Sequence, residues 1–484
     1  VRLGGARRAR MGRWVRQGGD MTITSGVRRT APTDRPVRRL PRARATWVQG
    51  SDVVAVAAFV CVVTLGLWWQ HGGVDVLLGG GVSTLSGIGQ LSGLVAALAA
   101  LGGLVLTSRP RLIERRYGQD QLLAAHRWFG IVTVLAVVVH AITDTWAWGA
   151  ATGGSIVTGL VDLLANQAWM VAATVGTMII VIIGLSSWRR LRRLMPYETW
   201  YFVHLTGYLA VLLGFGHQLT LGTDFMGDPL AFWWWSGLFI VTVLVVTWAR
   251  LGDLLRSLTR RFHVTAVSHE ANGIGSLHLS GPGLRRLRVS GGQYFGVRAL
   301  TPHLWWQSHP LSLSAAPTTA GLRFTIKELG EDSTRLLQLA PGTRVILEGP
   351  YGVFTADRAM GAPVVLVAGG VGISPIRAVL EDCGPHQRPV VIVRVRDLDD
   401  AAHRIELERL VASRDGSLHI LTGRRPWFAR HDPFAPETLR AWIPDIADRH
   451  VFVCGPASLE AAVVKGVRRA GVPTAHIHHE RFGV

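Results

Sequence analysis

Four histidines lie within long apolar stretches of the sequence, where ionisable side chains are rare. His126 and His140 are separated by mostly apolar residues in AHRWFGIVTVLAVVVHA, and His204 and His217 occupy a second apolar stretch. An ionisable residue inside a membrane span is costly and usually serves a function. Neutral imidazole is a common iron ligand, and a haem iron can take two axial histidines. The pattern therefore predicts metal-ligating histidines on two helices.

The spacing of these histidines predicts two levels in the membrane. On a helix, a step of fourteen residues rises about 21 Å and returns to within roughly 40° of the same face, as from His126 to His140. A step of thirteen residues rises about 20 Å but ends roughly 140° away, as from His204 to His217. We expect His126 and His204 to form an inner pair and His140 and His217 an outer pair, each holding one haem.

Two haems, a shared zinc ion and a purely structural role are the three roles weighed for the four histidines. Two haems about 20 Å apart would bridge much of a hydrocarbon core about 30 Å thick. A shared zinc ion is disfavoured because the pairs are too far apart, and the remaining alternative is that the imidazoles only pack helices together. The poor angular match on the second helix needs either a local distortion, which Gly214 and Gly216 could permit, or imidazoles that approach from different sides. His71 and Asp144 could lie near the outer pair, although solvated loop positions are the favoured interpretation of both.

Six apolar segments are long enough to carry these histidines across a bilayer, since a crossing needs about 20 residues. The linkers 108–119 and 189–198 are rich in arginine, and the connections between the other span ends contain no Lys or Arg. Because cytoplasmic loops carry the positive charge, this alternation predicts a multi-pass protein of the cell (plasma) membrane with both termini cytoplasmic. The predicted spans lie near residues 52–70, 85–107, 126–148, 166–188, 199–220 and 231–251.

The composition supports a membrane protein and argues against nucleic-acid binding. The net charge is +19, and of the 51 basic residues only Lys327 and Lys465 are lysines. No nucleic-acid-binding motif accompanies the arginines, so we expect membrane lipid and no nucleic acid among the partners. The three cysteines form no CxxC pair, which favours a reducing compartment for the soluble part. The Arg-rich residues 1–48 cannot build a core and are predicted to be a disordered cytoplasmic tail.

The sequence changes character after the last span, which predicts a multidomain chain. Residues 49–255 form the predicted all-α six-helix transmembrane bundle. Residues 260–356 alternate short β-like runs with Gly/Pro turns, which predicts an antiparallel β-barrel. Residues 360–484 alternate apolar strands with helices, which is typical of an α/β domain with a parallel sheet.

A glycine-rich turn opens the second of these soluble domains. VVLVAGGVGISPIRAVL (364–380) has the pattern of a strand, a Gly-rich turn and a helix. Its glycines would let the backbone approach a pyrophosphate at the helix N-terminus, although plain turn glycines are the alternative. Arginines after the next two strands could grip an adenosine 2′-phosphate, which favours NADPH over NADH, or could be solvated surface residues. These arginines are Arg394, Arg396, Arg424 and Arg425.

Four motifs in a fixed order carry a family resemblance. HPLSLSAAP (309–317), GPYG (349–352), GGVGISP (369–375) and CGP (454–456) resemble the ferredoxin–NADP⁺ reductase type of flavoprotein module. Joined to six spans with two histidine pairs, residues 50–484 resemble the ferric reductase / NADPH oxidase superfamily. The ordered combination is more specific than any single motif.

The resemblance implies roles for individual residues in binding FAD. Leu311 stands where the family often has an aromatic that stacks on the flavin, and Ser312 matches the residue near the reactive flavin nitrogen. Gly330 and Ser333 match the turn that receives the FAD pyrophosphate. The residues that match the flavin motif itself are His309, Pro310, Leu311 and Ser312.

The resemblance also implies the nicotinamide-binding and catalytic residues. Cys454 matches the cysteine beside the nicotinamide, and Phe482 matches the aromatic residue that covers the flavin until nicotinamide displaces it. Arg396 and Arg424 are the expected contacts of the 2′-phosphate. The residues that match the dinucleotide motif are Gly369, Gly370, Gly372 and Pro375.

The combined expectation is a transmembrane oxidoreductase. By the resemblance, cytoplasmic NAD(P)H reduces FAD, and electrons pass through two b-type haems to an acceptor outside, which could be a ferric chelate, dioxygen or a protein. Animal oxidases of the family carry a histidine four residues after the outer ligand, and Asp144 here argues against a purpose-built oxygen site. The alternatives are a membrane transporter or receptor with a redox-sensing flavin domain and no haem, and a reductase merely anchored by its spans.

Overall fold

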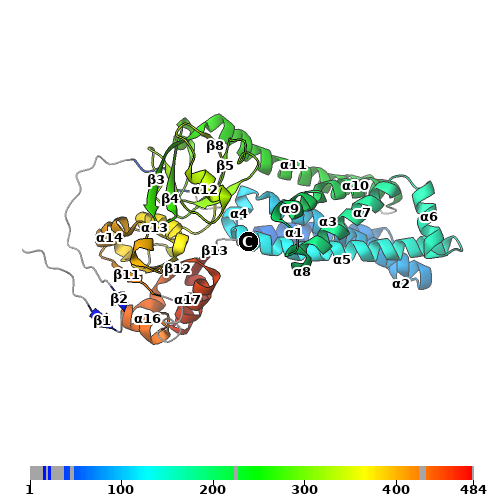
Figure 1. The fold of residues 1–484 in the computed structure, drawn as a ribbon. Coiled ribbons are helices and arrows are strands. Elements are labelled where there is room, and N and C mark those ends of the chain that lie inside the picture. Colours follow the sequence, from blue (N-terminus) through cyan, green and yellow to red (C-terminus); the bar gives the residue numbers. More distant parts are fainter. Residues whose placement is uncertain are drawn as a thin grey trace, which may run out of the picture. The chain divides into compact units, whose positions relative to one another are not determined.

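The computed structural model describes residues 15–17, 20–22, 38–43, 48–222, 227–423 and 432–481. The chain divides into two compact units (Figure 1). One unit is Thr46–Gly252, and the other combines Val1–Ala45 with Asp253–Val484. We call them the helical unit and the reductase unit and describe each by itself.

The helical unit is built from apolar helices, as predicted. Among the described residues, six helices are long and apolar enough to cross a membrane, and they match the six predicted spans to within a few residues except that the last helix runs on to Arg260. Large apolar side chains such as Val54, Leu135 and Val243 are exposed along them, which suits a lipid environment. The helices are α1 (Gly50–Gln70), α2 (Gly73–Leu78), α3 (Gly81–Ser108), α4 (Arg111–Tyr117), α5 (Gln119–Ala151), α6 (Ile156–Asn166), α7 (Met170–Ser187), α8 (Arg189–Arg192), α9 (Tyr197–Leu205), α10 (Gly207–Leu221) and α11 (Pro229–Arg260).

Small residues on α3 let α5 approach it closely. A Cβ added at Gly102 would lie 2.5 Å from the ring of Phe129, and one at Gly93 would lie 2.8 Å from His140 Nδ1. Only glycine leaves room at these contacts, and small residues at helix interfaces are a common device in membrane proteins. The glycines of α3 therefore bring its backbone next to the histidine-bearing face of α5.

The fifth span is interrupted at Thr206, between α9 and α10. The Thr206 amide donates to the Val203 carbonyl at 3.2 Å, which is a tighter turn than that of an α-helix. Between His204 and His217 the structure therefore has one tighter turn at Thr206, whereas Gly214 and Gly216 lie within the continuous helix α10.

The first part of the reductase unit is an antiparallel sheet of six strands, as predicted. The strand order is β6-β5-β8-β3-β4-β7, and an antiparallel bridge from Leu313 to Phe324 joins the continuation of β6 to β7. Apolar side chains including Phe295 and Phe324 fill the interior. The elements are β3 (Phe262–Ala271), β4 (Ile274–Ser280), β5 (Tyr294–Ala299), β6 (His309–Ser312), β7 (Leu322–Lys327), α12 (Glu331–Leu337) and β8 (Arg344–Tyr351).

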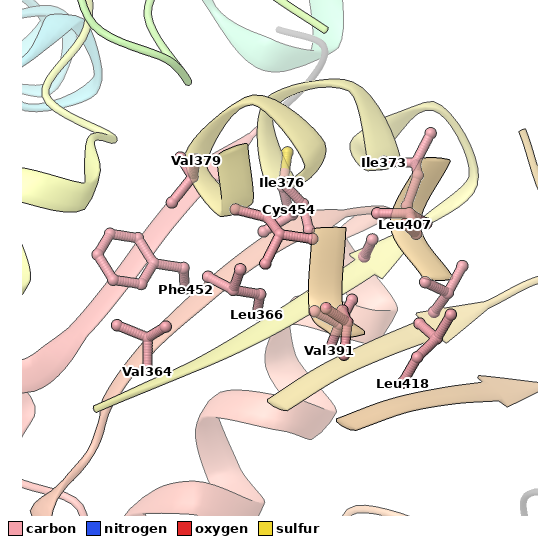
Figure 2. Packing of buried hydrophobic residues seen from close by; sticks show 14 of the residues in the cluster. Val364, Leu366, Ile373, Ile376, Val379, Val391, Leu407, Leu418, Phe452 and Cys454 are labelled. Carbon is pink, nitrogen blue, oxygen red and sulfur yellow. The ribbon is translucent and has the colours of Figure 1, made fainter. Parts of the chain in front are cut away.

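The second part of the reductase unit is a parallel sheet of five strands with the order β11-β10-β9-β12-β13, again as predicted. A dense apolar cluster packs α13 and α14 against it, and Figure 2 shows ten of its residues with labels. The central strands are buried along their whole length, as expected of a parallel sheet covered on both faces. The elements are β9 (Val364–Gly369), α13 (Ile373–Asp382), β10 (Val390–Arg394), α14 (Arg404–Ala412), β11 (Ser417–Leu421), α16 (Pro436–Trp442), β12 (His450–Gly455), α17 (Ala457–Arg469) and β13 (Ile477–Arg481).

Residues 38–43 differ from the predicted disordered tail, most of which lies outside the described residues. Leu40 is 5% exposed and belongs to the core of the antiparallel sheet. The backbone of Arg39 forms an isolated antiparallel β-bridge with Thr318, and the Arg39 guanidinium lies 3.0 Å from the Asp382 carboxylate. These contacts fix the segment because one leucine and its flanking arginines all find partners. A short hairpin of β1 (Val15–Gln17) and β2 (Asp20–Thr22) is also described.

Candidate functional site

The four membrane histidines face one another in the predicted pairs. The ring centroids of His126 and His204 are 5.9 Å apart, and those of His140 and His217 are 6.0 Å apart. An ion held at about 2 Å by one nitrogen of each ring would place the two centroids about 6 Å apart. The separation in both pairs therefore fits a metal held between two imidazoles.

Hydrogen bonds orient the two histidines of α5. His126 Nδ1 lies 3.2 Å from the Gly103 carbonyl oxygen, and His140 Nδ1 lies 3.0 Å from the Gly89 carbonyl oxygen. A carbonyl only accepts, so each Nδ1 carries the proton and each Nε2 keeps its lone pair. Metal-ligating histidines are commonly held in this way by a second acceptor. The arrangement leaves one basic nitrogen per ring for a ligand.

Open space lies beside the histidines on their own helices. Gly130 follows His126 by four residues and Gly214 precedes His217 by three, and a Cβ added at either glycine would meet no atom within 4 Å. Residues at these spacings share one helix face. The space is suited to a planar group lying against the backbone. Gly216 has a different role, because a Cβ there would lie 2.6 Å from the Trp169 ring.

Asp144 lies next to the outer histidine pair, although the sequence favoured a solvated loop position for it. Asp144 Oδ2 lies 2.9 Å from His140 Nδ1. A Cβ at Gly89 would overlap the Asp144 carboxylate, so the glycine makes room for this contact. His71, the other candidate, pairs with Asp228 at 3.1 Å. Asp144 therefore belongs to the surroundings of the outer pair.

The predicted flavin residues lie along β6 at the edge of the antiparallel sheet. Ser312 pairs with Tyr294 of β5 and is 5% exposed, Leu311 is half-buried and Pro310 is exposed. His309 Nε2 is buried without a hydrogen-bond partner among the described residues. Burial lowers the pKa of His309, and together with the charge of Arg298 it outweighs the opposing charge of Asp332. An unsatisfied neutral imidazole at a sheet edge is suited to a polar ligand.

The second predicted flavin segment caps α12. Ser333 Oγ accepts hydrogen bonds from the amides of Leu329 at 2.9 Å and Gly330 at 3.1 Å, and it donates to the Gly330 carbonyl at 2.7 Å. Ser333 thus folds the turn before the helix, and its side chain is committed to the backbone. Its position fits a role in shaping the turn.

The glycines of the nucleotide motif are required by close packing. Gly372 stands where a Cβ would overlap the Cys454 carbonyl, and at Gly369 a Cβ would overlap Leu459. Gly370 has φ +57°, a left-handed conformation that favours glycine. Pro375 lies in the first turn of α13, where its missing amide hydrogen costs nothing. The turn therefore brings the N-terminus of α13 close to the ends of β9 and β12.

The remaining predicted site residues lie in different surroundings and are not brought together among the described residues. Cys454 is fully buried in the apolar core, in the same cluster as Ile376 and Phe452, which Figure 2 also labels. Burial raises the pKa of its thiol well above the ordinary value, so it is protonated and unreactive in the structure described. Arg396 is exposed at the end of β10, whereas Arg394 folds back onto the Gly423 carbonyl. Phe482, Arg424 and Arg425 lie outside the described residues.

Sequence reasoning missed the acceptors behind the histidines and a polar network in the reductase unit. The carbonyls of Gly89 and Gly103 could have been suspected from the spaced small residues in SGIGQLSGLVAALAALGG. The network joins Glu270, Arg323, Thr325, Arg377, His403 and Glu406, which are far apart in the chain. Charged residues on separate elements carry no shared pattern, so local periodicity offered no signal for it.

One carboxylate of this network predicts a pH dependence of stability. Glu270 Oε2 lies 3.2 Å from the buried His403 ring. Burial alone would raise the pKa of Glu270, but bonds from His403, Ser276 and Ser268 outweigh it and hold the pKa at about 2. A depressed folded-state pKa adds stability above the unfolded pKa of about 4.3, and this contribution disappears as the pH falls toward 2.

We therefore expect the melting temperature of the reductase unit to fall steeply between about pH 4.5 and pH 2. The variant Glu270→Gln should lose stability at pH 7 and show a flatter decline in that window. Scanning calorimetry of both proteins checks this. Parallel pH curves for the two proteins would contradict it.

Comparisons with known proteins identify both units. Residues 92–215 match the family model described as ferric reductase like transmembrane component, and residues 366–465 match the oxidoreductase NAD-binding domain. The chain is 32% identical over 187 residues to ferredoxin–NADP reductase B of Sorangium cellulosum, covering 35% of this chain and 76% of that protein.

A second curated relative and a solved structure are also similar to parts of the chain. The chain is 30% identical over 233 residues to a flavohemoprotein of Pseudomonas aeruginosa, covering 46% of this chain and 59% of that protein. Among solved structures, the flavohem-like FAD/NAD-binding domain of a nitric oxide dioxygenase from Vibrio cholerae is matched with 22% identity and a TM-score of 0.38, covering 46% of this chain and 99% of that domain. The chain thus spans about three fifths of the flavohemoprotein it matches.

The two family models cover most of the second to fifth apolar helices and the part of the chain that contains the glycine-rich turn. A NAD(P)H oxidoreductase with an FAD- and NAD-binding module is the activity that these relatives support. The chain therefore joins a ferric reductase-like transmembrane component to a FAD- and NAD-binding module, and through that module it belongs to the ferredoxin–NADP reductase family.

Proposed function

We propose that the protein carries electrons from cytoplasmic NAD(P)H through FAD and two b-type haems to an acceptor on the outer face of the plasma membrane. The observation that supports this proposal most strongly is that the histidines face one another in two pairs at two levels of α5. The two ring centroids within a pair are 5.9 Å apart in one pair and 6.0 Å apart in the other. One level would serve a single haem, whereas two levels about 21 Å apart provide a route across most of the bilayer. When bound, FAD accepts a hydride from NAD(P)H, and the haems accept single electrons.

The residues of the chain would hold and orient these groups. His126 and His204 would ligate the inner haem and His140 and His217 the outer haem, with Gly103 and Gly89 fixing the rings of α5. Residues of β6 and α12 would hold FAD, namely His309, Pro310, Leu311, Ser312, Gly330 and Ser333. The turn before α13 and Arg396 would hold NAD(P)H, and Arg396 favours NADPH because a guanidinium can grip a 2′-phosphate.

The sidedness of the proposal is supported by residues 38–43. This segment precedes the first span, and the reductase sheets follow the last, yet Arg39 and Leu40 contact the sheets directly. Segments in contact lie on one side of a membrane, which requires an even number of spans between them. The arginine-rich linkers then favour the cytoplasm for that side.

Haem content tests the proposal against its main competitor. Purified protein should show a Soret band and reduced b-type bands after NADPH addition, at roughly two haems per chain. A transporter or receptor with a redox-sensing flavin domain would bind FAD alone. A well-folded, haem-supplemented preparation without a Soret band would refute the electron route.

The acceptor on the outer face is a ferric chelate or dioxygen in this proposal. Asp144 bears on the choice, because its carboxylate replaces the histidine that animal oxidases of the family carry at this place. A negative charge near the exit disfavours a dedicated site for superoxide formation and leaves ferric chelates as the first substrates to assay. Steady-state reduction of ferric citrate compared with superoxide release separates the two.

Asp144 also yields a prediction about potentials. A carboxylate hydrogen-bonded to Nδ1 of an imidazole makes that imidazole a more electron-donating ligand through Nε2, and this stabilises the oxidised state of the metal. The variant Asp144→Asn should therefore raise the midpoint potential of one haem and leave the other unchanged. Redox titration of the haem bands measures both. Two unchanged potentials would show that Asp144 does not act on the outer haem.

A further inference from the structure

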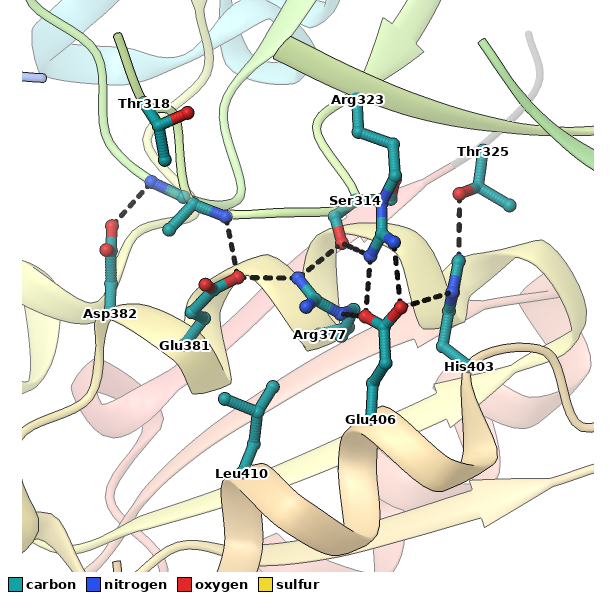
Figure 3. Close-up of polar contacts among 12 residues, drawn as sticks. Ser314, Thr318, Arg323, Thr325, Arg377, Glu381, Asp382, His403, Glu406 and Leu410 are labelled. Carbon is teal, nitrogen blue, oxygen red and sulfur yellow. Dashed lines mark hydrogen bonds and ion pairs between the residues drawn. The ribbon is translucent and has the colours of Figure 1, made fainter. Parts of the chain in front are cut away.

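Glu406 of α14 is held by arginines from both parts of the reductase unit. Arg323 of β7 donates two parallel hydrogen bonds to its carboxylate, each 2.9 Å long. Arg377 of α13 places its Nε 2.5 Å from the same carboxylate. Figure 3 shows Glu406 between the two guanidinium groups. Paired bonds of this kind are strong and directional, so the carboxylate joins the antiparallel sheet to the nucleotide-binding part.

Both arginines also grip the end of the flavin-motif strand. The Ser314 carbonyl oxygen accepts hydrogen bonds from Arg323 at 3.0 Å and from Arg377 at 2.9 Å. Ser314 is fully buried and follows Ser312 by two residues. Arg377 also pairs with Glu381 at 2.5 Å, and Glu381 accepts from the Ala316 amide at 2.9 Å. The strand end is thus bound to α13 at two successive points.

The same helix carries the nucleotide turn. Arg377 follows Gly372, the last glycine of that turn, by five residues. A continuous path of short contacts therefore runs from the flavin strand through Arg377 to the turn, and Glu406 closes it through Arg323. The four charged groups, Arg323, Arg377, Glu381 and Glu406, balance in sign, which suits their partly buried position.

The carboxylate at the centre of the path is ionised. Burial alone would raise the pKa of Glu406, but the bonds from Arg323 and the charge of Arg377 outweigh it and bring the pKa to about 2. The contacts therefore persist throughout the neutral and mildly acidic range.

We propose that Glu406, Arg323 and Arg377 form a clamp between the two parts of the reductase unit and act as positioning residues for hydride transfer. The clamp sets the distance between the strand that would carry the flavin ring and the helix that would carry the nicotinamide. Bound NADPH would give up a hydride from its nicotinamide and become NADP⁺, bound FAD would accept that hydride, and the three clamp residues would hold the two sites in place. A misplacement of about 1 Å can slow such a reaction on the order of 100-fold. This inference rests on the proposed function.

The test compares two substitutions of Glu406 with a control on the same helix. Glu406→Ala removes all the bonds, whereas Glu406→Gln keeps the shape and one acceptor oxygen. Glu408→Ala is the control, because Glu408 pairs at 3.3 Å with Arg404 of the same helix. Rapid-mixing measurements on the full chain with FAD bound give the rate of flavin reduction and its dependence on NADPH concentration.

We expect Glu406→Ala to reduce the limiting rate on the order of 10- to 100-fold with a KM for NADPH within about threefold of wild type. Glu406→Gln should recover part of the loss, and Glu408→Ala should match wild type. Amide hydrogen exchange of the full chain without FAD supplies a readout independent of activity. Residues 309–316 and 373–382 should exchange faster in Glu406→Ala than in the wild-type protein. In Glu408→Ala their exchange rates should equal those of the wild type.

The outcomes separate the clamp from the function on which it rests. Wild-type protein that NADPH does not reduce would overturn the proposed function itself. Wild-type protein that is reduced, with Glu406→Ala equally fast, would overturn the clamp alone. If Glu406→Ala does not fold, Glu406→Gln decides, and an unchanged rate and exchange pattern in that variant would overturn the clamp.

Discussion

Replacing His126 by leucine is expected to remove the inner haem and stop electron transfer across the membrane. Leucine has a similar volume and no ligand atom, so α5 should still pack against α3. The variant should bind roughly one haem per chain instead of two, and reduction of an outer-face acceptor by NADPH should fall to background. Haem extraction and the reduced-band spectrum measure the first effect, and ferric chelate reduction measures the second.

The same variant has a built-in control. The predicted flavin and nucleotide residues belong to the reductase unit, so reduction of a soluble dye by NADPH should continue at the wild-type rate. His217→Leu should behave alike at the outer level. Full haem content in either variant would mean that the histidine does not ligate, and the facing rings would then serve only to pack the helices.

Gly372→Val is expected to abolish NADPH oxidation. A Cβ at this position would lie within 2.5 Å of the Cys454 carbonyl carbon and would overlap its oxygen, and both are backbone atoms of β12 that cannot turn aside. Overpacking of this kind typically costs about 1–3 kcal/mol. The displaced turn should also lose its approach to the dinucleotide, and we expect turnover to fall at least on the order of 100-fold. Steady-state NADPH oxidation with a dye acceptor measures the loss.

Gly384→Ala is the matched control for that variant. Gly384 lies after α13, and a Cβ there would meet no atom within 4 Å. Its φ of −77° is open to any residue. It should retain wild-type turnover and stability. If Gly372→Val oxidised NADPH as fast as Gly384→Ala, the turn would not be the nucleotide site.

Together these variants divide the electron path into two halves. The histidine variants should interrupt it after the flavin, and the glycine variant before it. Haem reduction by dithionite should remain normal in Gly372→Val, because the helical unit is untouched. This pattern would link each unit of the chain to one part of the reaction.

The secondary structure and the order of the domains could be predicted because they depend on local pattern. Uniformly apolar stretches predict spans wherever they occur, since a bilayer satisfies no backbone polar group. The alternation of strand and helix predicts the parallel sheet in the same way. The motif from Gly369 to Pro375 was recognisable because the close approach of backbone to backbone permits little besides glycine.

Certain features needed the folded chain. The spacing of His204 and His217 on an ideal helix predicts opposite faces, yet both rings face histidines of α5 in the folded chain. The burial of Cys454 was also hidden, because a residue at a strand end can face solvent or core.

The contacts that tune the site depend most on tertiary structure. Asp144 is on the same helix as His140, yet its contact exists only because Gly89 of α3 leaves it room. The clamp of Arg323, Arg377 and Glu406 joins residues up to 83 positions apart. Local periodicity reflects the surface on which each element is buried, so it predicts elements and their faces. Pairing between distant charges depends on the relative placement of those elements, which the chain acquires only when it folds.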